Sequence, residues 1–361
     1  MDRAGRPWRR RFALAAKISL SAVVLAMVVL HADPAGLGRG LAGASRSGLA
    51  VAGAAFLAIP LLGGLRWWAS LRGIGQKARL GPISAIFSTV AVAAQVLPSV
   101  AADGMRVWLA VRRGHDLPAT VQSVILERVF MVLALLALAL AAAPLLAART
   151  GEAGPVWVCA ALLLAGFAGL ALLMAADKIG PGLSRLRPWR AVAAAAPATR
   201  RLVLSRWGAG LALSSLISNL NFALAAFLLG RALGLPATAA DFLAVMPAVT
   251  LATTLPISFG GWGVREGMFV VLLGHVGVAP GAALALSLLY GAGNVVCGVP
   301  ALLVWFGEGR LALPGSGRWL VDWFASTGAS MAGPAWVPRG TRPPAAPRPG
   351  APRSGGRTGV G

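Results

Sequence analysis

Acidic residues and arginines stand close together inside strongly apolar sequence, and these are the side chains with the clearest capacity for chemistry. They form three groups: Asp103 with Arg106, Glu127 with Arg128, and Arg265 with Glu266. Ionisable residues are costly inside a membrane, so they are usually paired, buried within protein and functional. None of the groups includes a recognisable nucleophile. They therefore suggest the binding or positioning of a charged group rather than covalent catalysis.

Glycines break the backbone directly before the third group. Three of them lie within the stretch LPISFGGWGVREG, at Gly260, Gly261 and Gly263. Glycine lets the chain turn and approach a ligand or another helix closely. A half-helix beginning near Val264 would present free N–H groups and a positive dipole end. With Arg265 beside them, these donors would suit a lipid phosphate, and we expect a similar arrangement near Gly104 and Arg106.

The partners of the charged groups can be narrowed by helix geometry. Adjacent residues do not share a helix face, so we expect Glu127 and Arg128 to bond to other segments rather than to each other. The same expectation holds for Arg265 and Glu266. One hypothesis pairs Glu127 with Arg106 or Arg265. The alternative is that all of these groups only hold the fold together, with Glu127 and Arg128 forming an interfacial ion pair at a helix start.

The composition identifies the environment in which these residues must be placed. The chain has 361 residues, of which 57% are hydrophobic and 12% charged, and its net charge is +22. A soluble protein carries about twice that share of charge, so the composition is typical of a polytopic membrane protein. No soluble domain is left to bind nucleic acid. Cys159 and Cys297 lie in apolar runs without a Cys/His cluster, so no metal, cofactor or disulfide framework is expected.

Apolar runs of about 20 residues predict membrane-spanning helices. Six such spans are expected, at 12–31, 48–65, 122–148, 155–176, 208–230 and 281–306. Two shorter runs, 83–97 and 242–255, each end at a Leu-Pro pair and precede a break and an arginine. We expect each to form one arm of a re-entrant, broken-helix hairpin.

Loop charges support this topology, because cytoplasmic loops are rich in Lys and Arg. A full crossing at 83–97 would place three arginines outside, whereas a hairpin over 83–113 keeps them inside with the basic segment 1–11. The loops 66–80 and 177–207 are likewise expected inside. The second hairpin, 242–279, then enters from the opposite face.

The two hairpins resemble each other in sequence. LPSVAADGMRVWLAV and LPISFGGWGVREGMFVV share a Leu-Pro start, a break and an arginine. The sequence therefore predicts an all-α polytopic membrane protein, with six full spans and two broken hairpins arranged as an inverted repeat. Matching breaks in two halves are a pointer to a transporter site. Polar residues within the spans, such as Ser215, Ser218 and Asn219, are expected mainly to join helices.

Both motifs, together with SVILERV around Glu127, resemble the transmembrane domain of bacterial lysylphosphatidylglycerol synthases, the multiple peptide resistance factor proteins. The likeness covers about residues 10–306. Members usually have two glycines before the aspartate, where this chain has Ala101 and Ala102. The resemblance implies a domain that moves or binds lipid. The synthase domain of the two-domain members is absent, so transferase activity is not expected.

Three regions follow from these observations: a basic cytoplasmic N-terminus at 1–11, a flippase-like transmembrane domain at 12–306, and a basic Pro/Gly-rich tail at 307–361, expected to be disordered and cytoplasmic. We expect a non-enzymatic lipid translocase of the bacterial inner membrane, handling a phospholipid, glycolipid or hopanoid-type lipid. Its partners would be membrane lipids, mainly with anionic headgroups, and a cytoplasmic lipid-modifying enzyme. The alternative is a non-transporting lipid-binding or scaffold subunit of an envelope lipid biosynthesis complex.

Overall fold

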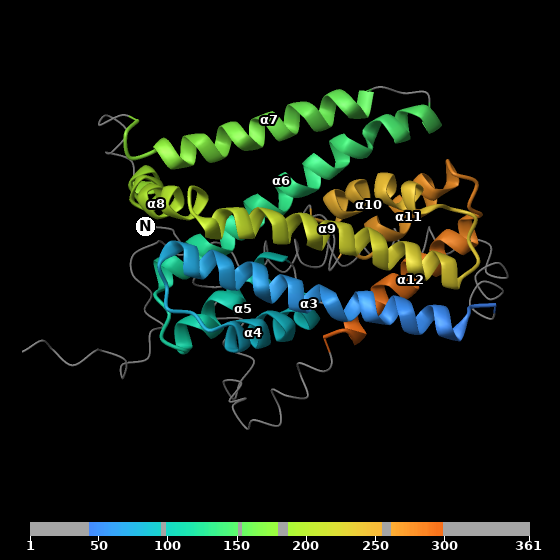
Figure 1. Ribbon diagram of the computed structural model, residues 1–361, viewed down its shortest axis with the longest axis horizontal. Coiled ribbons are helices and arrows are strands. Elements are labelled where there is room, and N and C mark those ends of the chain that lie inside the picture. Colours follow the sequence, from blue (N-terminus) through green and yellow to red (C-terminus); the bar gives the residue numbers. More distant parts are fainter. Residues whose placement is uncertain (1–42, 95–98, 151–153, 180–186, 255–260, 299–361) are drawn as a thin grey trace, which may run out of the picture. The chain divides into compact units, whose positions relative to one another are not determined.

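Helices make up all the regular structure that is described. The computed structural model describes residues 43–94, 99–150, 154–179, 187–254 and 261–298 (Figure 1). The helices are α3 (Arg46–Ile74), α4 (Leu80–Ala93), α5 (Ser99–Arg112), α6 (Leu117–Thr150), α7 (Gly154–Ala175), α8 (Arg187–Val203), α9 (Arg206–Ala232), α10 (Ala239–Thr254), α11 (Val264–Gly274) and α12 (Pro280–Val296).

Four of these helices, α3, α6, α7 and α9, are long and apolar enough to cross a membrane. They coincide with four of the predicted spans, which confirms an all-α polytopic membrane protein. The helix α12 covers the described part of the predicted span 281–306. The predicted span 12–31 and the predicted terminal segments 1–11 and 307–361 lie outside the described residues.

The helix α3 is longer than the sequence predicted. The segment 66–80 was expected to be a loop because it begins with an arginine, but the helix continues to Ile74. It ends at Gly75, whose φ of 103° is in the left-handed region that glycine adopts readily. The prediction was wrong because Arg66 is neutralised inside the protein, as described below.

A second correction concerns the basic segment 177–207. It was predicted as a loop, yet residues Arg187–Val203 form α8. The segment is rich in alanine, the strongest helix former, and its arginines lie toward the two ends of the helix. The high charge that suggested a loop is therefore carried by a helix.

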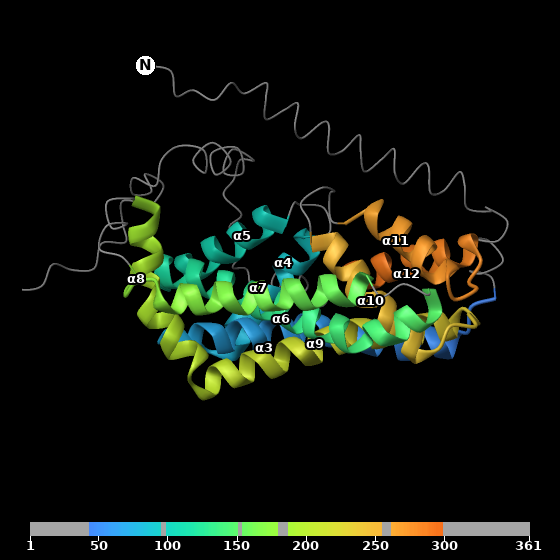
Figure 2. The ribbon, with the colours of Figure 1, turned by 90° about the horizontal axis from the view of Figure 1, so that it is seen from above.

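The helices α3 and α9 lie side by side and antiparallel along their length (Figures 1 and 2). At one end, the N–H of Ser45 donates to the carbonyl of Ala232 over 2.8 Å. At the other end, the rings of Trp68 and Trp207 meet edge to face with centroids 5.2 Å apart. Small residues such as Gly48, which lies against Ala232, allow this close approach.

The pairs α4–α5 and α10–α11 each fold back toward the end of the bundle at which they begin. Arg113, just after α5, donates to the carbonyl of Pro82 at the start of α4 over 3.0 Å. Val278, just after α11, belongs to the same apolar cluster as Phe242 near the start of α10. Because α3 and α9 are antiparallel, the two pairs begin at opposite ends (Figures 1 and 2).

The same order of elements therefore occurs twice, and the two copies run in opposite directions. A long helix, two short helices and a further helix occur as α3–α4–α5–α6 and again as α9–α10–α11–α12. Each half has its own apolar core, around Trp67 and Ile86 in the first and around Phe242 and Phe269 in the second. This is the arrangement expected of an inverted repeat.

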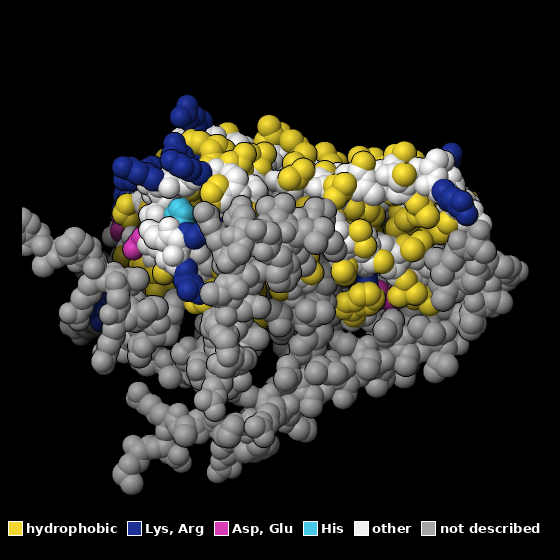
Figure 3. Space-filling model, turned by 90° about the horizontal axis from the view of Figure 1, so that it is seen from below, with side chains coloured by type: hydrophobic (Ala, Val, Ile, Leu, Met, Phe, Trp, Pro, Cys, Tyr) yellow, Lys and Arg dark blue, Asp and Glu magenta, His cyan; other side chains and the backbone are white. Residues whose placement is uncertain are grey.

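Positive charge is concentrated at one end of the bundle, where α3 finishes and α9 begins. The exposed basic residues at this end are Arg72, Lys77, Arg79, Arg112, Arg113, Lys178, Arg190, Arg201 and Arg206. At the opposite end, the described exposed basic residues are Arg46 and Arg231. Figure 3 shows this gathering of Lys and Arg side chains at the left end of the view. We call it the basic end.

Candidate functional site

A continuous series of hydrogen-bonded side chains begins on α9 and runs through the first half of the protein. Its members, in order, are Ser218, Arg66, Glu127, Arg106, Asp103 and Arg128. Arg66 donates from Nη1 to Ser218 Oγ over 2.7 Å, and its Nε and Nη2 both lie 2.7 Å from Glu127 Oε1. The other carboxylate oxygen of Glu127 accepts from Arg106 Nη1 over 2.8 Å. We call this series the ion-pair chain.

The outer part of the ion-pair chain is centred on Asp103. Arg106 Nη2 donates to Asp103 Oδ1 over 2.6 Å. Arg128 binds the same carboxylate through two nitrogens, with Nη2 2.9 Å from Oδ1 and Nε 3.1 Å from Oδ2. Each carboxylate in the chain therefore bridges two guanidinium groups, which is the pairing that makes burial of such groups tolerable.

The inner members of the ion-pair chain are buried, and its outer members are exposed. The side chains of Arg66, Glu127 and Arg106 are 7%, 2% and 3% exposed, whereas Asp103 is 22% and Arg128 is 47% exposed. Three arginines and two carboxylates leave one positive charge in excess. Because the inner members are closely paired, Arg128 is the cation that a ligand from outside can reach.

Aromatic rings fix the position of Arg106. Its guanidinium carbon lies 5.2 Å from the ring centroid of Trp67 and 5.1 Å from that of Phe87. Trp67 is itself held by a 3.0 Å hydrogen bond from its indole nitrogen to Ser123 Oγ. Cation–π contacts of this kind are strongest where water is excluded, as it is here. The inner part of the chain is therefore a rigid element that joins α3, α5 and α6.

A second charged cluster lies at the start of α11, in the other half. Arg265 Nη2 donates to Glu266 Oε1 over 2.6 Å, and both side chains are buried. Ser287 of α12 donates to the same oxygen over 3.1 Å. The N–H of Gly263 donates to Glu266 Oε2 over 2.5 Å. Arg265 also lies over the ring of Trp262, 4.5 Å from its centroid.

This second cluster is electrically neutral and enclosed. The carboxylate of Glu266 occupies the N-terminus of its own helix, where the sequence had placed a lipid phosphate. Left-handed φ values of 79° at Gly261 and 84° at Gly263 bring the backbone into position for this cap. Gly291 of α12 lies against the guanidinium of Arg265, so that a β-carbon at this position would overlap it.

The structure tests the predicted partners of the charged side chains. Glu127 binds Arg106, which confirms one of the two partners considered for it, and Arg128 bonds to another segment as expected. The prediction for Arg265 and Glu266 was wrong, because these neighbours bond to each other. At the first turn of a helix the glutamate folds back toward the preceding N–H, and the long arginine side chain can reach it there.

Two further placements differ from the sequence prediction. Gly104 lies within α5, which begins at Ser99, so the expected helix N-terminus is not at Gly104. Glu127 lies ten residues into α6, about 15 Å from its start, and it is buried, so an interfacial ion pair at a helix start does not describe it. The predicted site residue Gly260 lies outside the described residues.

Arg66 was missed as a member of the site. The sequence places it at the end of an apolar run, before two tryptophans, and it was assigned to a cytoplasmic loop. Ser218 was expected mainly to join helices, and it also accepts a hydrogen bond from Arg66. Glu127 has no base nearby on its own helix face. This is the sequence signal that could have indicated a further buried arginine as its partner.

The fold and these clusters define a class: a polytopic helical membrane protein with two oppositely oriented halves and an ion-pair chain buried in the first. Residues 14–300 match the family described as the lysylphosphatidylglycerol synthase TM region. The chain belongs to this family. A comparison with curated proteins gave no match. The family assignment agrees with the resemblance seen in the charged motifs.

Proposed function

We propose that the protein is a flippase-like lipid translocase that moves a lipid with an anionic headgroup between the two leaflets of a membrane. The single observation that carries the proposal is the ion-pair chain, which runs from the interior to an exposed arginine and holds one positive charge in excess. A network that only stabilised the fold would need no more than two arginines to neutralise its two carboxylates. Membership of a lipid-related membrane family supports the same conclusion.

Arg128 is proposed as the first contact of the headgroup. A phosphate oxygen would replace one of its two hydrogen bonds to Asp103, and Asp103 would remain paired with Arg106. Exchange of one charge-assisted bond for another avoids leaving a buried charge without a partner, which is the costly outcome. Arg106 and Glu127 would then orient the headgroup beneath the surface.

The cluster of Arg265 and Glu266 is proposed to serve the other half of the transport cycle. Its glycines Gly261 and Gly263 form the turn that lets Glu266 cap α11. Movement of that carboxylate would free both the cap and Arg265 for a phosphate. In this mechanism, the two halves rock against each other and expose the lipid first at one face and then at the other.

The membrane orientation is also a proposal. The basic end would lie in the cytoplasm, because Lys and Arg accumulate on that side. Both termini would then be cytoplasmic, and the protein would lie in the bacterial inner membrane. The pairs α4–α5 and α10–α11 would be re-entrant hairpins that enter from opposite faces. No chemical step is assigned to the protein, and a cytoplasmic lipid-modifying enzyme would supply or receive its lipid.

A transport assay separates this function from its alternative, a non-transporting lipid-binding or scaffold subunit. The protein would be reconstituted into liposomes that contain fluorescent phosphatidylglycerol, lysylphosphatidylglycerol or a glycolipid, and the fluorophore in the outer leaflet would be quenched chemically. A translocase makes more than half of the fluorophore accessible over time in protein-containing liposomes. Accessibility equal to that of protein-free liposomes for every lipid would instead support the scaffold.

A further inference from the structure

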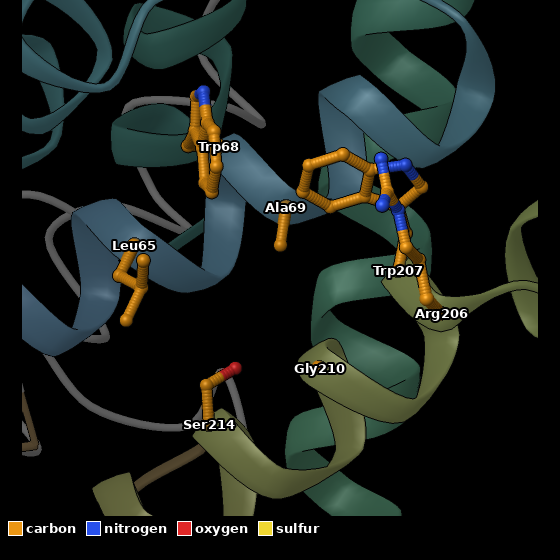
Figure 4. Close-up of a pocket in the computed structure, with 7 residues that line it drawn as sticks. All are labelled: Leu65, Trp68, Ala69, Arg206, Trp207, Gly210 and Ser214. Atoms are coloured by element: carbon orange, nitrogen blue, oxygen red, sulfur yellow. The ribbon is translucent and has the colours of Figure 1, made fainter.

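A groove on the outer surface of α3 and α9 is separate from the ion-pair chain. It has a volume of about 480 Å³ (Figure 4). Leu65 and Ala69 of α3 form one wall, and Gly210 and Ser214 of α9 form the other. The hydroxyl of Ser214 is occupied by a hydrogen bond to the carbonyl of Leu211. The walls are therefore apolar, with room created by the small residues.

Aromatic and cationic side chains stand at the end of the groove nearest the basic end. Trp68 and Trp207 line it there, together with Arg206. The guanidinium carbons of Arg206 and Arg72 lie 5.3 Å and 5.6 Å from the ring centroid of Trp207. Among the described residues, no carboxylate lies within ion-pair distance of either arginine. This end of the groove thus carries two positive charges.

The surface around the groove is apolar. Leu61 of α3 and Leu213 of α9 are exposed, and Leu57 and Ile217 continue the same exposed surface along the two helices. Both helices are long and apolar enough to cross a membrane. Such a surface faces lipid rather than water, and tryptophan and arginine are typical of the level at which headgroups lie.

We propose that this groove binds one anionic phospholipid as a stationary component of the protein. One acyl chain lies between Leu65 and Gly210, and the phosphate is bound by Arg72 and Arg206. Guanidinium groups suit this role because they donate two parallel hydrogen bonds to a phosphate. A lipid with a zwitterionic headgroup fills the groove less well, because its own ammonium group opposes the two arginines.

The bound lipid would also support the ion-pair chain. Ser214 lines the groove, and its carbonyl accepts a 2.7 Å hydrogen bond from Ser218 Oγ, the inner end of the chain. A ligand that holds α3 against α9 therefore stabilises the segment that carries Arg66 and Ser218. We expect binding to raise the temperature at which the protein unfolds. The proposal does not depend on whether the protein transports lipid.

Binding can be measured with the full-length protein in an uncharged detergent. Phosphatidylglycerol and phosphatidylcholine with identical chains are added, and the rise in Tm and the bound lipid detected by native mass spectrometry are compared. We expect phosphatidylglycerol to bind about tenfold more tightly or better, as one charge-assisted contact implies. Equal binding of the two lipids would overturn the proposal.

Matched variants locate the site. The double variant Arg72→Gln/Arg206→Gln should remove the preference for phosphatidylglycerol, whereas Arg112→Gln/Arg190→Gln, which changes exposed arginines away from the groove, should keep it. Gly210→Phe should reduce binding of both lipids by filling the groove. A β-carbon at Gly210 meets no atom within 4 Å, so this variant should fold.

The position-matched control for Gly210→Phe is Gly53→Phe on α3, where a β-carbon also meets no atom within 4 Å and which does not line the groove. Gly53→Phe should bind lipid as the unchanged protein does. Retention of the lipid preference in Arg72→Gln/Arg206→Gln would contradict the proposal. A protein dimer that dissociates in Gly210→Phe without loss of lipid would show that a second copy of the chain occupies the groove instead.

Discussion

The Nε of Arg66 on α3 lies 2.7 Å from Oε1 of Glu127 on α6, although 61 positions separate the two residues in the sequence. Both side chains are buried. The contact joins α3 to the part of the ion-pair chain that continues through Arg106 and Asp103 to the exposed Arg128. It explains why an arginine can stand inside a membrane-spanning helix. It also makes Glu127 the acid on which two arginines depend.

The first prediction concerns stability. Glu127→Gln keeps the shape of the side chain but removes the charge that pairs with Arg66 and Arg106. Leaving a buried charge without its partner typically costs about 3–5 kcal/mol, so we expect a large fall in Tm in detergent. Asp177→Asn is the control, because Asp177 pairs with Arg200 near the surface and such pairs contribute little.

Coupling can be tested in the same assay. If the loss in Glu127→Gln comes from uncompensated charge, then Arg66→Gln/Glu127→Gln should lose less stability than the two single changes added together. Equal losses in Glu127→Gln and Asp177→Asn would show that the inner pair does not stabilise the fold.

The second prediction concerns the enclosed cluster around Arg265. Gly291→Ala places a methyl group where the guanidinium lies, and that group cannot move without breaking its bonds to Glu266 and Ser287. Overpacking of this kind costs about 1–3 kcal/mol. The measurement is the Tm of Gly291→Ala beside that of Gly274→Ala, where a β-carbon meets no atom within 4 Å.

Gly274→Ala should be neutral or slightly stabilising, since alanine is the better helix former by about 1 kcal/mol. The packing described around Arg265 is incorrect if Gly291→Ala behaves in the same way.

The third prediction concerns pH. A bidentate hydrogen bond from Arg200 lowers the pKa of Asp177 below its ordinary value of 3.8. Because the folded pKa is the lower one, the pair stabilises the protein above the unfolded value and this contribution is lost as the pH falls through the folded pKa. The Tm difference between the unchanged protein and Asp177→Asn should therefore be small but positive at pH 6 and should shrink as the pH falls below 3.8. A difference that grows as the pH falls would oppose this assignment.

Much of the fold follows from the sequence because the length of an apolar run indicates whether its helix can cross a membrane. The short runs at 83–97 and 242–255 predicted two broken pairs of helices, and the structure has two short helices in each region, α4 and α5 in the first and α10 and α11 in the second. The errors occur where charge was used alone. Arg66 was placed in a loop because its partner lies 61 residues away. The helix α8 was missed because its arginines were interpreted as a sign of a loop, although its alanines favour a helix.

The sequence predicted most members of the ion-pair chain and one of its contacts, between Glu127 and Arg106, but it missed Arg66. Asp103, Arg106, Glu127 and Arg128 were selected because they are ionisable residues in apolar sequence, and the structure brings all four together. The closed pair of Arg265 and Glu266 was not predicted, since its bond depends on left-handed glycines and on Ser287 of another helix. Helix-face rules do not apply at a helix start.

The central claim is that the excess positive charge at the exposed end of the ion-pair chain moves an anionic lipid. The most direct test is the initial rate of phosphatidylglycerol transfer between leaflets of reconstituted liposomes for Arg128→Gln, compared with Arg190→Gln, which removes an exposed arginine from α8. Arg128→Gln leaves two arginines balanced by two carboxylates, so it should fold. We expect the rate for Arg128→Gln to be at most about one tenth of that of the unchanged protein, as loss of a charge-assisted contact implies. We expect no change in rate for Arg190→Gln. A rate for Arg128→Gln equal to that of the unchanged protein, at equal reconstitution, would contradict the central claim.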